Sequence, residues 1–398
     1  MKRINKLFND FLEDEKTAGI ILIICTIISL IIANSIFQNS YLEFWKTPIR
    51  LQFGDFNFFN HHGEPLSLDT FINDALMTVF FLMVGLELAR EIYIGELSNV
   101  KQALLPIMAA LGGILIPAGI YAYFNYNTET ASGTGIPMAT DIAFALGVLS
   151  LLGKRIPLAL RVFLTALAVI DDLGAIIVIA LFYTQDLSMF SLGTALGIWA
   201  ILLILNLLKV KSLIPYIIGG IIMWYFMLNS GVHATITGVL LAFVIPFGDG
   251  GKNTKSYQLL SALHHPVSFL ILPVFALANT AIVIDSGFPE LFSQPYTLGI
   301  FLGLVLGKPL GIFLFTFIAC KSKLCVLPSQ IGWKQLMGIS FLGGIGFTMS
   351  IFITLLAFDP VMHYDYINNA KFMILISSLC AAILGFTYLN FIYRKKNI

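Results

Sequence analysis

Long apolar runs separated by short polar linkers dominate this chain. Most runs are about 20 residues long, the length that an α-helix needs to cross a hydrocarbon core of about 30 Å. The runs lack the alternation of apolar and polar residues that is typical of a barrel strand. We therefore predict membrane-spanning helices over residues 18–36, 70–92, 103–124, 137–152, 159–182, 191–208, 213–228, 232–246, 259–283, 297–320, 336–358 and 371–393.

Composition and charge agree with this pattern. The chain is 58% hydrophobic and only 11% charged, outside the range of soluble globular proteins. The first run is too long for a signal-peptide core, so we expect it to remain as the first helix of a single membrane domain over residues 1–398. Its net charge of +1, without a basic stripe, does not favour nucleic-acid binding.

Lys and Arg residues predict the orientation. Of the 23, 19 fall in one alternating set of linkers, the opposite set has Lys46, Arg50 and Lys371, and Lys308 lies inside a predicted span. Cytoplasmic loops carry the excess of Lys and Arg in membrane proteins. We therefore expect both termini to be cytoplasmic.

Several ionisable residues lie inside the predicted spans. A charged side chain near the bilayer centre costs about 2.5 to 3.5 kcal/mol on the insertion scale. A structural ion pair that holds helices together remains an alternative for any single residue, whereas a functional role is the better interpretation of the whole set. The set comprises Asp74, Glu87, Asp141, Asp171, Asp172 and Lys308.

Two adjacent carboxylates, Asp171 and Asp172, interrupt the apolar run ALAVIDDLGAIIVIALFY. Burial and mutual repulsion disfavour two charges there, so the pair can hold protons near neutral pH. When deprotonated it offers hard oxygen ligands, which suit Na⁺ or Li⁺ better than soft metals. Competition between protons and the cation, combined with alternating access, predicts an exchange mechanism. Successive helical residues point about 100° apart, so one carboxylate can bind the ion while the other meets Lys308.

Two stretches read as interrupted helices, GTGIPMATDIAFALG and FLGGIGFTMSIF. Transporters with inverted repeats use a pair of broken helices whose half-helix ends meet near the bilayer midplane. Asp141 would compensate the positive N-terminal ends of the half-helices, and Lys308 the negative C-terminal ends. Lys308, in VLGKPLGIF, would also pair with a carboxylate and release it.

The chain resembles bacterial NhaA sodium/proton antiporters over nearly its whole length. The resemblance rests on ATDIAFALGVLSLLG, ALAVIDDLGAI, GKPLGI, GIGFTMSIF, SGVHAT, VGLELARE and INDALM. It implies an all-α polytopic fold of twelve transmembrane helices with inverted repeats, in which spans four and eleven are discontinuous and cross. It also implies exchange of cytoplasmic Na⁺ or Li⁺ for external H⁺ across the inner membrane, for sodium and pH homeostasis, with no enzymatic activity and no cofactor.

The resemblance also assigns site residues. Asp172 and Asp171 match the ion-binding and proton-carrying aspartates, and so the transient Na⁺ or Li⁺ ligands. Lys308 matches their partner lysine, and Thr140 with Asp141 the crossing-site residues. A charge count at this site predicts that about two protons exchange for one Na⁺, which makes transport electrogenic. One-for-one exchange is the alternative.

A second group of residues resembles the funnel and pH-responsive positions of the family. Asp74 and its neighbour Asn73 match positions near the cytoplasmic funnel, and the other members of this group are Glu87, Arg90, Glu91, His233 and His265. For His233 we favour structural packing, with a part in the pH response as the alternative. Ser261 and Ala262 replace Glu and His of the family cluster at span nine, and Ala89 replaces a basic residue. These departures put the usual pH sensor in doubt and leave the transport site unchanged.

The linker before the second span contains PIRLQFGDFNF and HHGEPLSL, a partly alternating pattern with turn residues. In the family this position forms a β-hairpin that pairs across a homodimer, and exposed strand edges are pairing surfaces. We expect a periplasmic hairpin over residues 46–68 and a homodimer; a flexible external loop is the alternative.

Three other functions remain to be weighed. An intramembrane aspartyl protease could use Asp141 and Asp172, but the chain lacks a GxGD signature. An ion channel would need a continuous polar pore, whereas these charges cluster in one place. A sodium-coupled symporter of an organic solute could share the fold.

Overall fold

The computed structural model describes residues 2–50, 52–53, 56–61, 64–183, 187–284, 287–328, 330–359 and 362–394. Its contacts divide the chain into two compact units. The first comprises Met1–Ile27, Glu96–Ala175 and Ile282–Ile398, and the second comprises Ile28–Gly95 and Ile176–Ala281. Helices α1 (Lys2–Ala33) and α7 (Leu158–Phe182) run through both units.

The rest of the first unit is helical in the part that the structure describes. Its elements are η2 (Glu96–Ser98), α5 (Val100–Phe124), η3 (Glu129–Met138), α6 (Ile142–Ser150), η4 (Gly153–Arg155), α13 (Phe288–Ser293), α14 (Pro295–Leu302), η6 (Gly303–Gly307), α15 (Lys308–Lys321), α16 (Trp333–Gly343), α17 (Phe347–Ala357) and α18 (Tyr364–Arg394).

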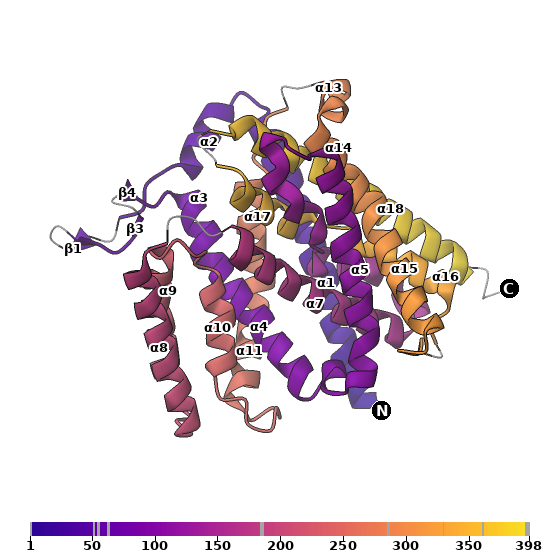
Figure 1. Ribbon diagram of the computed structural model, residues 1–398, viewed down its shortest axis with the longest axis horizontal. Coiled ribbons are helices and arrows are strands. Elements are labelled where there is room, and N and C mark those ends of the chain that lie inside the picture. Colours follow the sequence, from indigo (N-terminus) through magenta and orange to yellow (C-terminus); the bar gives the residue numbers. More distant parts are fainter. Residues whose placement is uncertain are drawn as a thin grey trace. The chain divides into compact units, whose positions relative to one another are not determined.

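Glycines bring α5 and α15 of this unit into close contact (Figure 1). A Cβ atom added to Gly112 would overlap the carbonyl group of Gly311, and one added to Gly311 would overlap that of Gly112. Small residues allow backbones to approach in this way inside membranes. The contact holds the first turn of α15, where Lys308 lies, against the interior of the unit, and the Lys308 side chain is fully buried.

The second unit contains α2 (Gln38–Trp45), α3 (Leu68–Phe71), η1 (Ile72–Leu76), α4 (Met77–Tyr93), α8 (Met189–Leu207), α9 (Ile214–Leu228), α10 (Ile236–Val244), α11 (Lys255–Pro266), η5 (Val267–Ile271) and α12 (Leu272–Asn279). Helices α4 and α10 also approach through a glycine, because a Cβ at Gly238 would overlap the carbonyl oxygen of Thr78.

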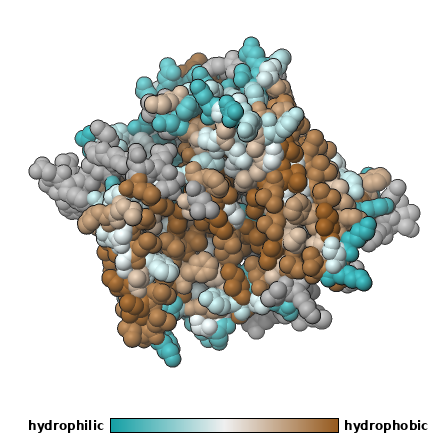
Figure 2. All heavy atoms as spheres, in the orientation of Figure 1, coloured by the Kyte–Doolittle hydropathy of each residue, from teal (hydrophilic) through white to brown (hydrophobic). Residues whose placement is uncertain are grey.

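Eight of the described helices are long and apolar enough to cross a membrane: Lys16–Ala33, Leu68–Tyr93, Ala103–Phe124, Leu158–Ala180, Met189–Leu207, Lys255–Asn279, Pro295–Lys321 and Tyr364–Arg394. Two broken pairs raise the number to 10; η3 with α6 is bent by 41°, and α16 with α17 by 46°. Hydrophobic residues cover the exposed faces of the long helices (Figure 2). The prediction of a multi-pass helical membrane protein is confirmed.

Two predicted spans have shorter helices. Residues 213–228 correspond to α9 with 15 residues, and residues 232–246 to α10 with 9. An α-helix of 9 residues is about 14 Å long, which is less than the hydrocarbon thickness. A count of twelve spans therefore stays a prediction.

The linker before α3 contains two short antiparallel ladders. Strand β1 (Gln52–Phe53) pairs with β2 (Phe56–Asn57), and β3 (Asn60–His61) pairs with β4 (Glu64–Pro65). Phe58 and Phe59 pack against a buried cluster of Leu66, Trp224, Leu228 and Ala234. Leu51, Gly54, Asp55, His62 and Gly63 of this linker lie outside the described residues. The hairpin over residues 46–68 and its role in a homodimer stay predictions.

Candidate functional site

The two helix breaks of the first unit are in direct contact. The backbone N–H of Asp141 donates to the carbonyl oxygen of Ile345 at 2.7 Å, and Thr140 Oγ1 lies 2.8 Å from the carbonyl oxygen of Gly343. Pro137 cannot donate a helical hydrogen bond just before the first break, and glycines surround the second. The sequence thus brings four half-helix ends to one place.

Asp141 caps two of these ends. Its Oδ1 accepts from the backbone N–H of Phe144 at 2.9 Å, at the beginning of α6. Its Oδ2 accepts from the backbone N–H and the hydroxyl of Thr348, at 3.1 and 2.5 Å, at the beginning of α17. A carboxylate at a helix N-terminus satisfies free N–H groups and favours the helix dipole. One buried side chain therefore stabilises the N-termini of both half-helices.

Lys308 lies beside the C-terminal end of η3. Its Nζ is 2.9 Å from Asp171 Oδ2, and both side chains are fully buried. Nζ also donates to the carbonyl oxygen of Met138, the last residue of η3. An ammonium group there offsets the negative end of the helix while it neutralises the carboxylate.

Thr140 joins this ion pair. Its hydroxyl lies 2.7 Å from Asp171 Oδ2, the same oxygen that Lys308 contacts. The second oxygen, Oδ1 of Asp171, has no hydrogen-bond partner among the described residues. Asp172, the next residue of α7, is 1% exposed. The site therefore combines two buried carboxylates, one hydroxyl and one ammonium group.

Asp74 lies in a separate cluster within the second unit. Its Oδ1 is 3.4 Å from Nε2 of His233, and its backbone carbonyl accepts from the indole of Trp224 at 3.4 Å. Asn73 accepts from Asn279 at 2.7 Å. These contacts link η1 to α9, to the segment that precedes α10 and to α12.

Glu87, Arg90 and Glu91 lie at the other end of α4. The guanidinium of Arg90 is 5.4 Å from the centre of the Tyr257 ring on α11. Glu87 is more than three helical turns from Asp74, about 20 Å along the axis, so the two groups are separate clusters on one helical segment. His265 is an exposed residue of α11. Its ring stacks on that of Phe269 in η5, with ring centres 5.6 Å apart.

Sequence reasoning missed the groups that hold the half-helices from outside the breaks. Thr348 provides two of the donors to Asp141, Ser350 donates to the carbonyl of Ile136 at 2.7 Å, and Ser378 accepts from the backbone N–H of Phe347 at 3.0 Å. The hydroxyls in FTMS were a signal for the first two, since Ser and Thr near a helix N-terminus serve as local hydrogen-bonding groups. Ser378 lies in α18 and had no local signal.

Comparison with known proteins decides the family. The family model "Na+/H+ antiporter 1" matches residues 9–389. The chain belongs to this family of antiporters. It is 58% identical over 396 residues to the Na⁺/H⁺ antiporter NhaA of Flavobacterium psychrophilum, covering 100% of this chain and 99% of that protein.

Other relatives agree across nearly the full length. The Na⁺/H⁺ antiporter NhaA of Cytophaga hutchinsonii is 54% identical over 393 residues, 99% of this chain and 97% of that protein. The Na⁺/H⁺ antiporter NhaA of Helicobacter pylori is 44% identical over 421 aligned positions, 96% and 94% of the two chains. The predicted family is therefore confirmed. As a member, the chain is a transporter rather than an enzyme, and Na⁺ and H⁺ are its transported substrates rather than cofactors.

Proposed function

We propose that this antiporter exports cytoplasmic Na⁺ or Li⁺ across the bacterial inner membrane in electrogenic exchange for external H⁺, for sodium and pH homeostasis. Asp171 and Asp172 form the transient cation site, which opens alternately to each side. The observation that carries this proposal is the fully buried Lys308–Asp171 pair at the contact of two helix breaks, with Asp172 next to it.

The exchange step follows from the contacts of Asp171. In the proton-loaded state Lys308 is charged and occupies Oδ2 of Asp171, together with the Thr140 hydroxyl. When Na⁺ binds the two carboxylates, its charge displaces the Lys308 proton and the proton of Asp172. The neutral amine can still donate to the carbonyl of Met138, so the lysine need not leave its place. Two protons therefore leave for each Na⁺ that binds.

The helix breaks make this site movable. Half-helix ends that are held by side chains, with Asp141 at the N-termini and Lys308 at the C-terminal end of η3, can shift without breaking the long helices around them. We infer that the two discontinuous helices cross here, as spans four and eleven of twelve, and that their displacement exposes Asp171 and Asp172 to alternate sides.

We further infer that both termini are cytoplasmic, from the distribution of Lys and Arg. The end of α4 with Glu87, Arg90 and Glu91 then faces the cytoplasm, and Asp74 with His233 lies deeper along the same span. That Asp74 lies near the cytoplasmic funnel stays part of the proposal. A homodimer through the linker that contains β1 to β4 completes the proposal, because its short strands leave edges for pairing.

Everted vesicles from a strain without its own antiporters test the site. We expect Asp172→Asn to abolish the Na⁺-induced pH change, because it removes an anionic oxygen at nearly constant size. Asp171→Asn should be severely impaired, with lower membrane abundance since Lys308 loses its partner. The matched control is Asp365→Asn, an exposed residue of α18 that should behave as wild type. A normal pH response in Asp172→Asn and Asp171→Asn at equal abundance would exclude this pair as the ion site.

A further inference from the structure

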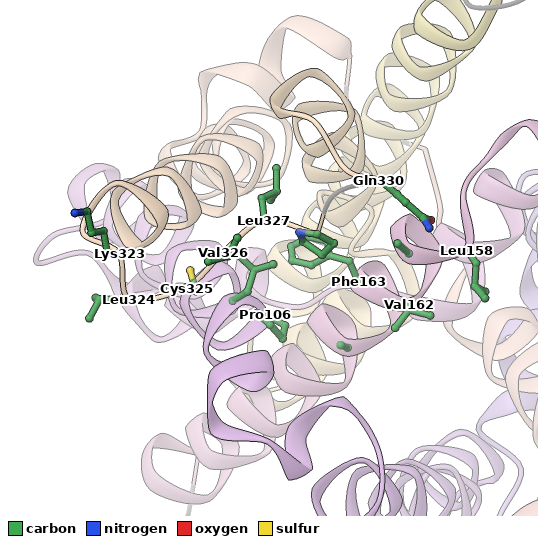
Figure 3. Close-up of a pocket in the computed structure, with 14 residues that line it drawn as sticks. Pro106, Leu158, Val162, Phe163, Lys323, Leu324, Cys325, Val326, Leu327 and Gln330 are labelled. Carbon is green, nitrogen blue, oxygen red and sulfur yellow. The ribbon is translucent and has the colours of Figure 1, made fainter.

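A cavity of about 960 Å³ lies in the first unit, away from the ion site. Its wall combines the beginnings of α5 and α7 with the segment that follows α15, and none of Thr140, Asp141, Asp171, Asp172 and Lys308 lines it. Figure 3 shows Phe163, Val326 and Pro106 in the middle of the lining, with Lys323 and Leu158 at opposite ends. Its volume is in the range of small-molecule sites.

The lining is apolar and reaches the surface. Leu158, Leu324 and Val326 are 53%, 55% and 84% exposed, at the ends of helices that are long enough to span a membrane. Lys323 is exposed and is the charged residue among the described lining, which contains no carboxylate. The positive charge of Lys323 at the opening of the cavity disfavours the entry of cations, so the cavity is not a good path for Na⁺ to Asp171. An apolar groove with a cationic end instead complements a molecule with a hydrocarbon chain and an anionic head.

The backbone at Lys323 is in the left-handed region, with φ 58°. The backbone N–H of Leu324 donates to Ala319 and that of Lys323 to Cys320, the pattern that ends many helices with glycine at this position. A lysine there is strained where glycine would not be. Lys209 ends α8 in the same way, with φ 60° and matching hydrogen bonds, but it does not line the cavity. Lys209 is therefore a matched control for both the strain and the charge.

We propose that the cavity binds an acyl chain of an anionic phospholipid, whose phosphate pairs with Lys323. The hydrocarbon chain lies along Leu158, Val162 and Phe163 of α7 and against Val326. The same helix carries Asp171 further along, so the bound lipid supports the beginning of the helix that holds the ion site.

Photo-crosslinking tests the proposal on the full-length chain. The probe is phosphatidylglycerol with a diazirine in one acyl chain, in vesicles of phosphatidylethanolamine and phosphatidylglycerol. After irradiation and digestion, mass spectrometry should find the label enriched in peptides with residues 158–166 and 323–330. Lys323→Gly relieves the backbone strain and should lower labelling of these peptides about fivefold, the effect of one lysine near an anionic surface.

Two further variants separate the effect of the charge at Lys323 from the effects of backbone strain and of cavity volume. Lys209→Gly removes an equivalent charge and relieves the same strain, so it should leave labelling of residues 158–166 unchanged. Ala159→Phe narrows the cavity while Lys323 stays, and should also reduce the labelling. The proposal is wrong if a phosphatidylcholine probe labels these peptides equally, if Lys323→Gly labels as wild type does, or if the label spreads evenly over the exposed faces of the helices.

Discussion

At the scale of the residue, the decisive contact is the buried ion pair between Lys308 and Asp171. Removing one partner of such a pair costs about 3 to 5 kcal/mol, because the other charge stays buried without compensation. We expect Lys308→Ala to lower the melting temperature and to abolish exchange, and Lys308→Arg to retain part of both. Lys321→Ala, an exposed lysine on the same helix, is the control. A Lys308→Ala protein with wild-type melting temperature and exchange would exclude the compensating role.

Thr140 provides a second prediction at this scale. Its hydroxyl contacts Asp171 and the carbonyl of Gly343, and Thr140→Val removes it at constant shape. A hydrogen bond to a charged group contributes about 1.5 to 3 kcal/mol, so we expect the apparent KM for Na⁺ to rise about tenfold or more. Thr316→Val is the control, since Thr316 is a buried threonine whose hydroxyl, among the described residues, donates to the carbonyl of Ile312 in its own helix. An unchanged KM in Thr140→Val would show that the hydroxyl does not support the ion site.

The sequence predicted these residues unequally, for physical reasons. A charge in an apolar run is conspicuous because it is costly, and this singled out Asp141, Asp171, Asp172 and Lys308. Because a buried charge needs a partner of opposite charge or a hydrogen-bond donor, the sequence also predicted that these side chains make contacts. Hydroxyls such as Ser378 cost little in any helix, so no local pattern distinguishes one that caps a distant half-helix from one that bonds its own backbone.

At the scale of the element, hydropathy located every long helix but not the internal form of the broken ones. The 3₁₀ segment η3 begins at Glu129, well before the predicted beginning at residue 137. Its sequence ETASGTG is too polar for a lipid-facing helix. The segment is stable because Thr130, Gly133 and Ile136 are buried within the unit. Packing of this kind depends on distant partners, which one sequence does not reveal.

The glycine contact between α5 and α15 supports an element-scale prediction. Alanine at Gly112 places a Cβ against the backbone of Gly311, and side-chain rotation cannot relieve that overlap. We expect Gly112→Ala to lower the free energy of unfolding by about 1 to 3 kcal/mol, the usual cost of overpacking. Gly119 lies on the same helix with no atom within 4 Å of an added Cβ, so Gly119→Ala should be neutral or slightly stabilising. Equal melting temperatures for the two variants would contradict this packing.

At the scale of the whole molecule, the pH dependence of transport follows from competition at the ion site. Protons on Lys308 and Asp172 oppose the binding of Na⁺, so activity should rise with pH and then level off as these two groups deprotonate. Ser261 and Ala262 are exposed on α11 and cannot titrate, so we expect a shallower rise than in antiporters with ionisable residues there. A tenfold rise in Na⁺ should move the midpoint to lower pH, by about half a unit for two competing protons and about one unit for one. A midpoint that ignores Na⁺ would require a separate sensor.

Electrogenic exchange is the prediction that tests the complete cycle. If two protons enter for each Na⁺ that leaves, every cycle moves one net positive charge inward. A membrane potential that is negative inside then drives Na⁺ out, with about 2.3 kcal/mol per 100 mV for each charge moved. In proteoliposomes, valinomycin with a K⁺ gradient sets the potential at zero pH difference, and ²²Na⁺ reports the flux. We expect net Na⁺ movement that reverses with the sign of the potential, and none with Asp172→Asn. Flux that is indifferent to the potential would mean one-for-one exchange, in which Lys308 stays charged and a single carboxylate carries the proton.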